Sequence, residues 1–309
     1  MMSTSSSAYL DLIAACDNFS YSQDAAREFY LLFIAEDDRA HGYMHPTIVE
    51  KMPWHDGFLV DHTARTVRTK SPSCSADFQE LVDAIIDRNI FNTVGGRHSE
   101  YFSVPGALQP VQIERFAVAL FGTTARGAHL TAYITTDNGD MMIWVPRRSS
   151  AVKTYPGMLD TTVAGGVRAH ESPFETIVHE ADEEASIAES LVRRDAKSCG
   201  VLTYIHQTDQ TFFAEQGLVV PDMVHVYDLE LKPGVVPTPK DDEVKEFYLM
   251  SVSDVQAKLK AGAFKPNSAV VMIDFFIRHG ITNPDNEEHF IDICMRMHRR
   301  LLFPVSKRR

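Results

Sequence analysis

The chain has 309 residues, of which 44% are hydrophobic, so it can form one large domain or two smaller ones with buried cores. Thirty Lys and Arg against 42 Asp and Glu give a net charge of −12, which argues against nucleic acid or an anionic membrane as the main partner. No apolar run approaches the roughly 20 residues that a membrane-spanning helix needs. Four scattered cysteines without a Cys-x-x-Cys pair favour reduced thiols in a cytoplasmic protein.

Short helices and strands are predicted in the first part of the chain. The clearest is an amphipathic helix over residues 75–89, whose apolar residues recur at helical spacing. The others are a helix at 8–16, strands at 28–35 and 41–46, a turn and strand at 95–104, and a short helix at 114–122 that a glycine ends. Gly and Thr cluster at 122–129, and there we divide an α+β N-terminal domain, residues 1–125, from a second domain, residues 126–309.

The pattern changes after residue 130. Two strands, at 130–136 and 141–148, flank Asn138-Gly139, which favours a hairpin with a type I′ turn. Further predicted elements are strands at 201–207 and 223–231, a helix that Asn267 caps and Gly280 ends, a last helix after Asp285, and a solvated basic tail at 299–309.

The stretch 165–187, GGVRAHESPFETIVHEADEEASI, carries the most information about function. A glycine pair opens it, and a helix with a strong start signal follows. Ser172 is a favourable N-cap residue, Pro173 fits the first helical position, and Glu175 completes a capping box.

The spacing of three glutamates in this helix points to a metal site. Glu180, Glu183 and Glu184 stand at i, i+3 and i+4, so their side chains project from one helix face. Like charges at this spacing repel, and a bound divalent cation would turn the repulsion into attraction. Carboxylate ligands without His or Cys in the row favour Mg²⁺ or Mn²⁺ over zinc.

The stretch resembles the signature of the Nudix hydrolases, Gly-x5-Glu-x7-Arg-Glu-U-x-Glu-Glu-x-Gly-U, where U is a bulky apolar residue. Two positions depart from it, since His179 stands where the family has Arg and Ser186 where it has Gly. The flanking segments YPGMLDTTVAGG and FKPNSAVVMIDFFIRHG look like the thiamine-pyrophosphokinase-related branch, which carries an extra N-terminal domain. The residues in register are Gly165, Glu171, Glu180, Glu183, Glu184 and Ile187.

The resemblance implies an α/β/α sandwich with a mixed sheet and assigns roles to the matching positions. Glu180, Glu183 and Glu184 become metal ligands, together with the Gly165 carbonyl. Either Glu180 or Glu183 could serve as the base that activates water. Glu171 is expected to fix the loop onto the helix. His179 offers one hydrogen bond where Arg would make a bidentate contact, so slower or more pH-sensitive turnover is expected.

Outside the stretch the candidates are weaker. A later carboxylate often completes such a site, and Glu243 is the candidate. Arg147 and Arg148, at the end of the hairpin, could reach substrate phosphates, although charge at the surface is an equally good explanation. Trp144 is expected in the core. Lys265, in the FKPN segment, could contact phosphate.

These patterns predict a metal-dependent pyrophosphohydrolase that acts on a small-molecule diphosphate. The branch implies thiamine diphosphate, or its oxidised or damaged analogues, cleaved to the monophosphate and phosphate. Two alternatives stay open: another Nudix substrate, such as ADP-ribose, a dinucleotide or a coenzyme A derivative, and a Nudix-like binding module without turnover. No nucleic-acid or membrane partner is expected, and a homodimer stays open.

Overall fold

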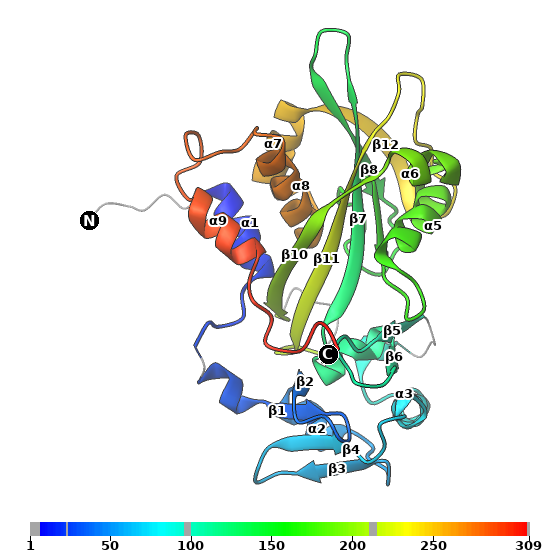
Figure 1. The fold of residues 1–309 in the computed structure, drawn as a ribbon, viewed down its shortest axis with the longest axis vertical. Helices are drawn as coiled ribbons and strands as arrows, with labels where there is room; N and C mark the ends of the chain where they lie inside the picture. Colours follow the sequence, from blue (N-terminus) through cyan, green and yellow to red (C-terminus); the bar gives the residue numbers. More distant parts are fainter. Residues whose placement is uncertain (1–6, 23, 96–99, 210–214, 308–309) are drawn as a thin grey trace, which may run out of the picture.

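The computed structural model describes residues 7–22, 24–95, 100–209 and 215–307. They form a small part built around one sheet and a larger part built around another (Figure 1). Part of the turn predicted at 95–104 lies in residues 96–99, outside the described residues. Among the described residues no helix is long and apolar enough to cross a lipid bilayer.

The small part contains a four-stranded sheet in the order β2-β1-β4-β3. One face packs on α3, whose residues Phe78, Leu81, Val82 and Ile85 are buried in the core. The predicted helix at 75–89 and the strands at 28–35 and 41–46 are therefore confirmed, whereas β3, β4 and α2 were not predicted. The elements are β1 Tyr30–Phe33, β2 Ala40–Met44, α2 Pro46–Lys51, β3 Phe58–Asp61, β4 Thr66–Thr69 and α3 Ser75–Asp87.

Short elements lead from this sheet to the larger one. Strand β5 pairs with β6 in a separate two-stranded sheet. Helix α4 ends at Gly122, which has a φ of 61°, as the sequence predicted for a glycine stop. The elements are two 3₁₀ turns, Asn92–Val94 and Arg115–Ala117, with β5 Tyr101–Ser103, β6 Gln112–Glu114 and α4 Val118–Phe121; another 3₁₀ turn, Ala25–Glu28, precedes β1.

The larger part is built on a six-stranded mixed sheet. Strands β10-β11-β7-β8-β12 lie in that order, and β9 pairs with β7 beside β8. Strands β11 and β7 are parallel, whereas the other pairs are antiparallel. The mixed sheet predicted for this part is confirmed. Its strands are β7 Ala125–Thr135, β8 Met141–Arg148, β9 Val163–Gly166, β10 Lys197–Gln207, β11 Val219–Glu230 and β12 Val244–Ser251.

The hairpin of β7 and β8 is confirmed, but its predicted turn type is wrong. A type I′ turn needs a positive φ at both central residues. Only Gly139 has one, at 85°, and Asn138 does not. The Gly139 N–H instead donates to the Thr136 carbonyl over 2.8 Å, and Thr136 N–H donates to the Asp140 carbonyl over 2.9 Å. The loop is thus longer than the two residues that a type I′ hairpin requires.

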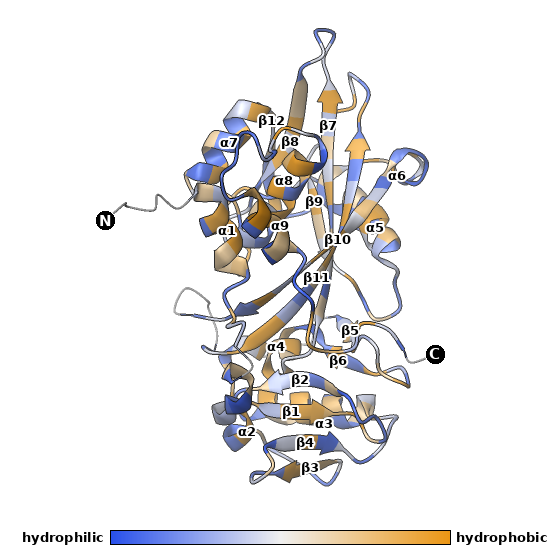
Figure 2. Cartoon of the chain, turned by 60° about the vertical axis from the view of Figure 1, so that its left-hand side comes forward, coloured by the Kyte–Doolittle hydropathy of each residue, from blue (hydrophilic) through white to orange (hydrophobic). Residues whose placement is uncertain are grey.

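Helices cover both faces of the large sheet (Figure 1), which gives the predicted α/β/α sandwich. One face packs on α5 and α6, and the other on α7 and α8, with α1 beside α8 and α9 beside α1. Helix α8 is mostly apolar (Figure 2) because the sheet and α1 bury it from two sides. The helices are α1 Ala8–Cys16, α5 Pro173–Ala185, α6 Glu189–Asp195, α7 Val252–Lys260, α8 Pro266–Arg278 and α9 Phe290–Met297.

Asn267 was predicted to cap α8, but it lies inside the helix, which begins at Pro266 with Lys265 at the cap position. Proline favours the first helical turn, which explains this start. Helix α1 is confirmed, yet Tyr9, Ile13 and Cys16 are buried in the same core as α8. The division at residue 125 stays a prediction. Helix α1 precedes this residue but packs against α8 and α9, which follow it.

The basic tail is not entirely solvated, contrary to the prediction. Arg299 is buried, and its Nη1 donates to Asp17 Oδ1 over 2.9 Å and to the Phe19 carbonyl over 2.7 Å. Arg296 Nη1 donates to the Asp17 carbonyl over 2.9 Å. The first residue of the tail therefore binds the end of α1 through a buried ion pair.

Candidate active site

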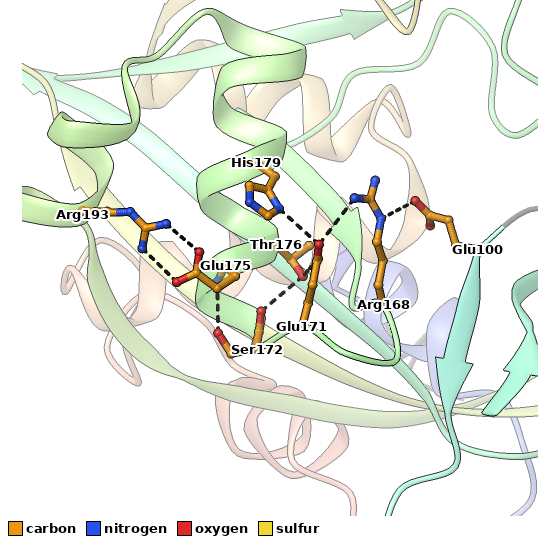
Figure 3. A network of polar contacts seen from close by, with 8 residues as sticks. All are labelled: Glu100, Arg168, Glu171, Ser172, Glu175, Thr176, His179 and Arg193. Atoms are coloured by element: carbon orange, nitrogen blue, oxygen red, sulfur yellow. Dashed lines mark hydrogen bonds and ion pairs between the residues drawn. The ribbon is translucent and has the colours of Figure 1, made fainter. Parts of the chain in front are cut away.

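Helix α5 begins where the sequence predicts. The Ser172 hydroxyl accepts the Glu175 N–H over 3.1 Å, and Pro173 occupies the first turn. The capping box is only half formed, because the Glu175 carboxylate turns to Arg193, with contacts of 2.8 and 2.6 Å (Figure 3). This ion pair joins the first turn of α5 to the last turn of α6.

The three glutamates of α5 lie in different environments. Glu184 is buried, with 6% of its surface exposed, and accepts the Ala164 N–H from β9 over 3.0 Å. Glu180 is partly buried and Glu183 is exposed. The helix thus presents one carboxylate against the sheet, one at its edge and one to solvent.

Burial and mutual repulsion disturb the two inner glutamates. Burial, the charge of Glu183 and smaller effects raise the pKa of Glu180 to about 7. Burial raises the pKa of Glu184 well above its usual range, Glu180 adds to the rise, and the Ala164 N–H opposes it. Desolvated carboxylates that repel each other are stabilised by a cation placed between them.

Gly165 lies against this cluster. A Cβ at this position would stand 2.4 Å from Glu180 Oε1, so any side chain would push the carboxylate away. The glycine therefore allows β9 and α5 to approach, as the signature requires. An oxygen-only donor set beside a bare backbone fits a hard divalent cation. Within the described residues, no three His, Cys, Asp or Glu side chains already stand in a metal-binding arrangement.

Glu171 lies in the loop before α5 and contacts the helix. Its Oε2 accepts the Thr176 hydroxyl over 3.1 Å, and its Oε1 lies 3.1 Å from His179 Nδ1 (Figure 3). Arg168 Nη1 also approaches Oε1, at 3.4 Å, and Arg168 Nε contacts Glu100 Oε1 at 2.6 Å. Arg168 and Glu100 were not predicted. Arg168 could have been found, since it lies inside the signature, whereas no local signal marks Glu100.

Ser186 ends α5 in the left-handed conformation, with a φ of 53°. Glycine favours that conformation, which explains why the family has Gly here. The Ser186 hydroxyl donates to the Thr238 carbonyl over 2.9 Å. The serine is thus accommodated by a bond to the segment that precedes β12.

The weaker candidates contact other protein groups, and Glu243 also lies close enough to Glu184 for its charge to add to the rise in the Glu184 pKa. Arg147 contacts Tyr248 and the Gly157 carbonyl. Glu243 is exposed, and its carbonyl accepts the Ser149 N–H over 2.8 Å. Trp144 is buried in the core between the sheet and α5, as expected.

Arg148 and Lys265 belong to a buried ionic cluster centred on Asp160. Arg148 Nη1 lies 3.0 Å from Asp160 Oδ2, and Lys265 Nζ lies 3.5 Å from the same atom. The surface alternative considered for Arg148 is wrong, since it is buried. Burial would raise the pKa of Asp160, but Lys265, His129 and Arg148 outweigh this and lower it to about 2.

His129 in this cluster gives a pH-dependent prediction. Burial, and then the charge of Lys265, lower its pKa to about 3, whereas an unfolded histidine titrates near 6.5. Below pH 6.5 the unfolded state therefore binds the extra proton, and stability falls as the pH falls. At pH 5 the loss is about 2 kcal/mol. The free energy of unfolding of wild type minus that of His129→Gln should drop by this amount between pH 7 and pH 5. A constant difference would contradict it.

Comparison with known proteins agrees with the geometry. The family model described as NUDIX domain matches residues 126–271. The protein YJR142W of Saccharomyces cerevisiae is 32% identical over 265 residues, 82% of this chain and 76% of that protein. "Nudix hydrolase 20, chloroplastic" of Arabidopsis thaliana is 30% identical over 288 residues, 88% of this chain and 73% of that protein. The solved structure of DR0079 from Deinococcus radiodurans, 20% identical, covers 56% of this chain and 98% of its own, with a TM-score of 0.41.

The matched region spans the hairpin, strand β9, helix α5 and most of α8. The signature glutamates lie on α5, and the signature glycine lies on β9, packed against Glu180. The chain belongs to the Nudix hydrolases, which cleave phosphoanhydride bonds in small-molecule diphosphates and generally use divalent metal ions.

Proposed function

We propose that Glu180, Glu183 and Glu184, with the Gly165 carbonyl, hold Mg²⁺ or Mn²⁺ against the diphosphate of the substrate. The observation that carries this is the burial of Glu184 and the partial burial of Glu180, side by side on α5, next to a glycine that leaves room for no side chain. The cation, when bound, screens the phosphate oxygens and makes water a better nucleophile.

The chain's own residues then divide the remaining tasks. The Ala164 N–H fixes the carboxylate of Glu184, which would bind the cation from the buried side of the site. Glu180 or Glu183 accepts the proton of the attacking water, and Glu183 is the more accessible of the two. Glu171 and His179 keep the loop on the helix. Glu243 stays a candidate for a further carboxylate ligand. The candidates for contact with the substrate's phosphates stay Arg147, Arg148 and Lys265.

We propose thiamine diphosphate, or its oxidised or damaged analogues, as the substrate, cleaved to the monophosphate and phosphate. The support is the resemblance of the segments around the signature and of FKPN to the thiamine-pyrophosphokinase-related branch. The alternative substrates are ADP-ribose, dinucleotides and coenzyme A derivatives. Membership among hydrolases favours an enzyme over a binding module without turnover.

A panel of diphosphates tests this assignment. Each compound is incubated with the full chain and Mg²⁺ or Mn²⁺, and phosphate and organic products are measured separately. We expect thiamine diphosphate or an oxidised form to give the highest kcat/KM, with phosphate and the monophosphate as products. Faster cleavage of ADP-ribose or a dinucleotide, with nucleoside monophosphate released, would contradict the substrate.

Compartment and assembly complete the proposal. We place the protein in the cytoplasm, because its four cysteines are unpaired and thiols persist in reducing compartments. Cell fractionation tests this placement. Light scattering at several concentrations would distinguish a homodimer, which the sequence leaves open, from a monomer.

A further inference from the structure

The loop that leads from β9 into α5 rests on strand β5, about 65 residues earlier in the chain. The Ala169 N–H donates to the Tyr101 carbonyl over 2.7 Å, and the Ser103 hydroxyl donates to the Ala169 carbonyl over 2.9 Å. A Cβ at Gly166 would stand 2.3 Å from the Phe102 ring. β5 therefore determines where the loop lies.

A charged residue next to β5 extends this contact into the site. Glu100 receives Arg168 Nε on Oε1 at 2.6 Å and Arg115 Nη1 on Oε2 at 3.1 Å. The Glu100 carbonyl also accepts the Arg115 N–H over 2.7 Å. An isolated surface pair contributes little, but here one carboxylate joins two guanidinium groups in a network. The network fixes the side chain of Arg168 at its Nε side.

The opposite side of the Arg168 guanidinium faces the catalytic helix. Its Nη1 lies 3.4 Å from Glu171 Oε1, the atom that His179 Nδ1 also contacts (Figure 3). Arg168 thus supplies the positive charge beside Glu171 that the signature arginine would supply from position 179, where this chain has His179.

We infer that Arg168, oriented by Glu100, acts as a positioning residue that replaces the arginine missing at position 179. The chain has moved the guanidinium from the helix to the loop and anchored it on a residue outside the matched family region. The role of the N-terminal part follows directly, since it completes the site through Glu100. This inference rests on the proposed function.

A double-mutant cycle tests the replacement in the full-length protein. Arg168→Gln should weaken Mn²⁺ binding and lower kcat by roughly 10–100-fold, the usual cost of losing a residue that orients metal ligands. In the Arg168→Gln background, His179→Arg should recover at least about tenfold of both losses, more than the same change gains in wild type. Mn²⁺ affinity is measured by electron paramagnetic resonance, which does not depend on the substrate.

The matched control is Arg193→Gln, which breaks an equally short ion pair between α6 and the first turn of α5 without touching Glu171. It should leave Mn²⁺ affinity and kcat within about twofold. If Arg168→Gln fails to fold, Arg168→Lys replaces it, because lysine keeps the charge but lacks the paired N–H donors of arginine. This variant should show an intermediate loss of Mn²⁺ affinity and kcat, which His179→Arg again relieves.

The outcomes separate the inference from the function on which it rests. If Glu184→Gln abolishes Mn²⁺ binding while Arg168→Gln leaves it unchanged, or if His179→Arg restores nothing, the inference is wrong and the function stands. If wild type binds no Mn²⁺ and cleaves no diphosphate, both are wrong. Glu100→Gln should show a smaller loss of the same kind, and an unchanged affinity would remove the N-terminal part from the site.

Discussion

Replacing Glu184 by glutamine is expected to lower kcat by two to three orders of magnitude, which corresponds to several kcal/mol of lost charge stabilisation (about 3–4 kcal/mol). The amide keeps the size of the side chain and can still accept the Ala164 N–H, so the backbone around β9 should be preserved. What disappears is the negative charge next to Glu180. Steady-state kinetics with saturating Mg²⁺ and the best diphosphate of the panel measure the effect.

The same variant should be more stable than wild type when no metal is present. Because burial and Glu180 raise the pKa of Glu184 in the folded state, ionising it costs stability as the pH rises through that pKa. Glutamine removes this cost, so the melting temperature at pH 8 should rise. Added Mn²⁺ should stabilise wild type by mass action and the variant much less.

Asp182→Asn is the matched control, since it removes one negative charge from the same helix at an exposed residue paired with Lys240. Turnover and metal-dependent stabilisation should stay within about twofold of wild type. A Glu184→Gln enzyme that keeps full turnover, or one no more stable than wild type without metal, would contradict the proposed role.

Arg299→Ala is expected to destabilise the fold by about 3 kcal/mol. The side chain of Asp17 has no exposed surface, and Arg299 is its nearest charged partner at 2.9 Å. Removing the guanidinium also frees the Phe19 and Ser20 carbonyls, which it binds at 2.7 and 2.9 Å. Arg296, 3.5 Å from Asp17, keeps the loss at the low end of the range for a broken buried pair.

Thermal and urea unfolding measure this loss, with a decrease in melting temperature of roughly 10 °C. Arg300→Ala provides the control, because the neighbouring side chain is exposed and carries the same charge. It should shift stability by less than about 0.5 kcal/mol. Equal effects of the two variants would mean that net charge, not the buried pair, holds the tail.

The parts of the structure that the sequence predicted have local causes. Helix α5 begins at Pro173 because Ser172 caps it, and α3 follows from its apolar spacing. The cap of α7 at Ser251, which accepts the Asp254 N–H over 3.1 Å, is another local signal, from which that helix could have been predicted. β12 is harder, since an edge strand exposed on much of its surface shows little alternation.

The features that were missed depend on contacts between distant residues. Glu100 reaches Arg168 across 68 residues, and Arg299 reaches Asp17 across 282. Neither pair has a local pattern, because an isolated acidic or basic residue most often faces water. Asn138 resembled a type I′ turn residue, but the length of the loop, set by the pairing of β7 with β8, decided otherwise. The signature predicted which glutamates share one face of α5. Their unequal burial could not be predicted, because it depends on the packing of α5 against β9.

The packing of α1 limits how the catalytic half could be prepared separately. A recombinant fragment starting at residue 126 would retain every signature residue, yet Tyr9, Ile13 and Cys16 would no longer cover α8. The uncovered apolar surface would promote aggregation during expression, even with the sheet and α5 unchanged. Co-expression with a peptide of residues 7–22, or its fusion to the fragment through a flexible linker, should cover α8 again, whereas Ile205 and Val219 would still lack the cover of Phe29 and Tyr43.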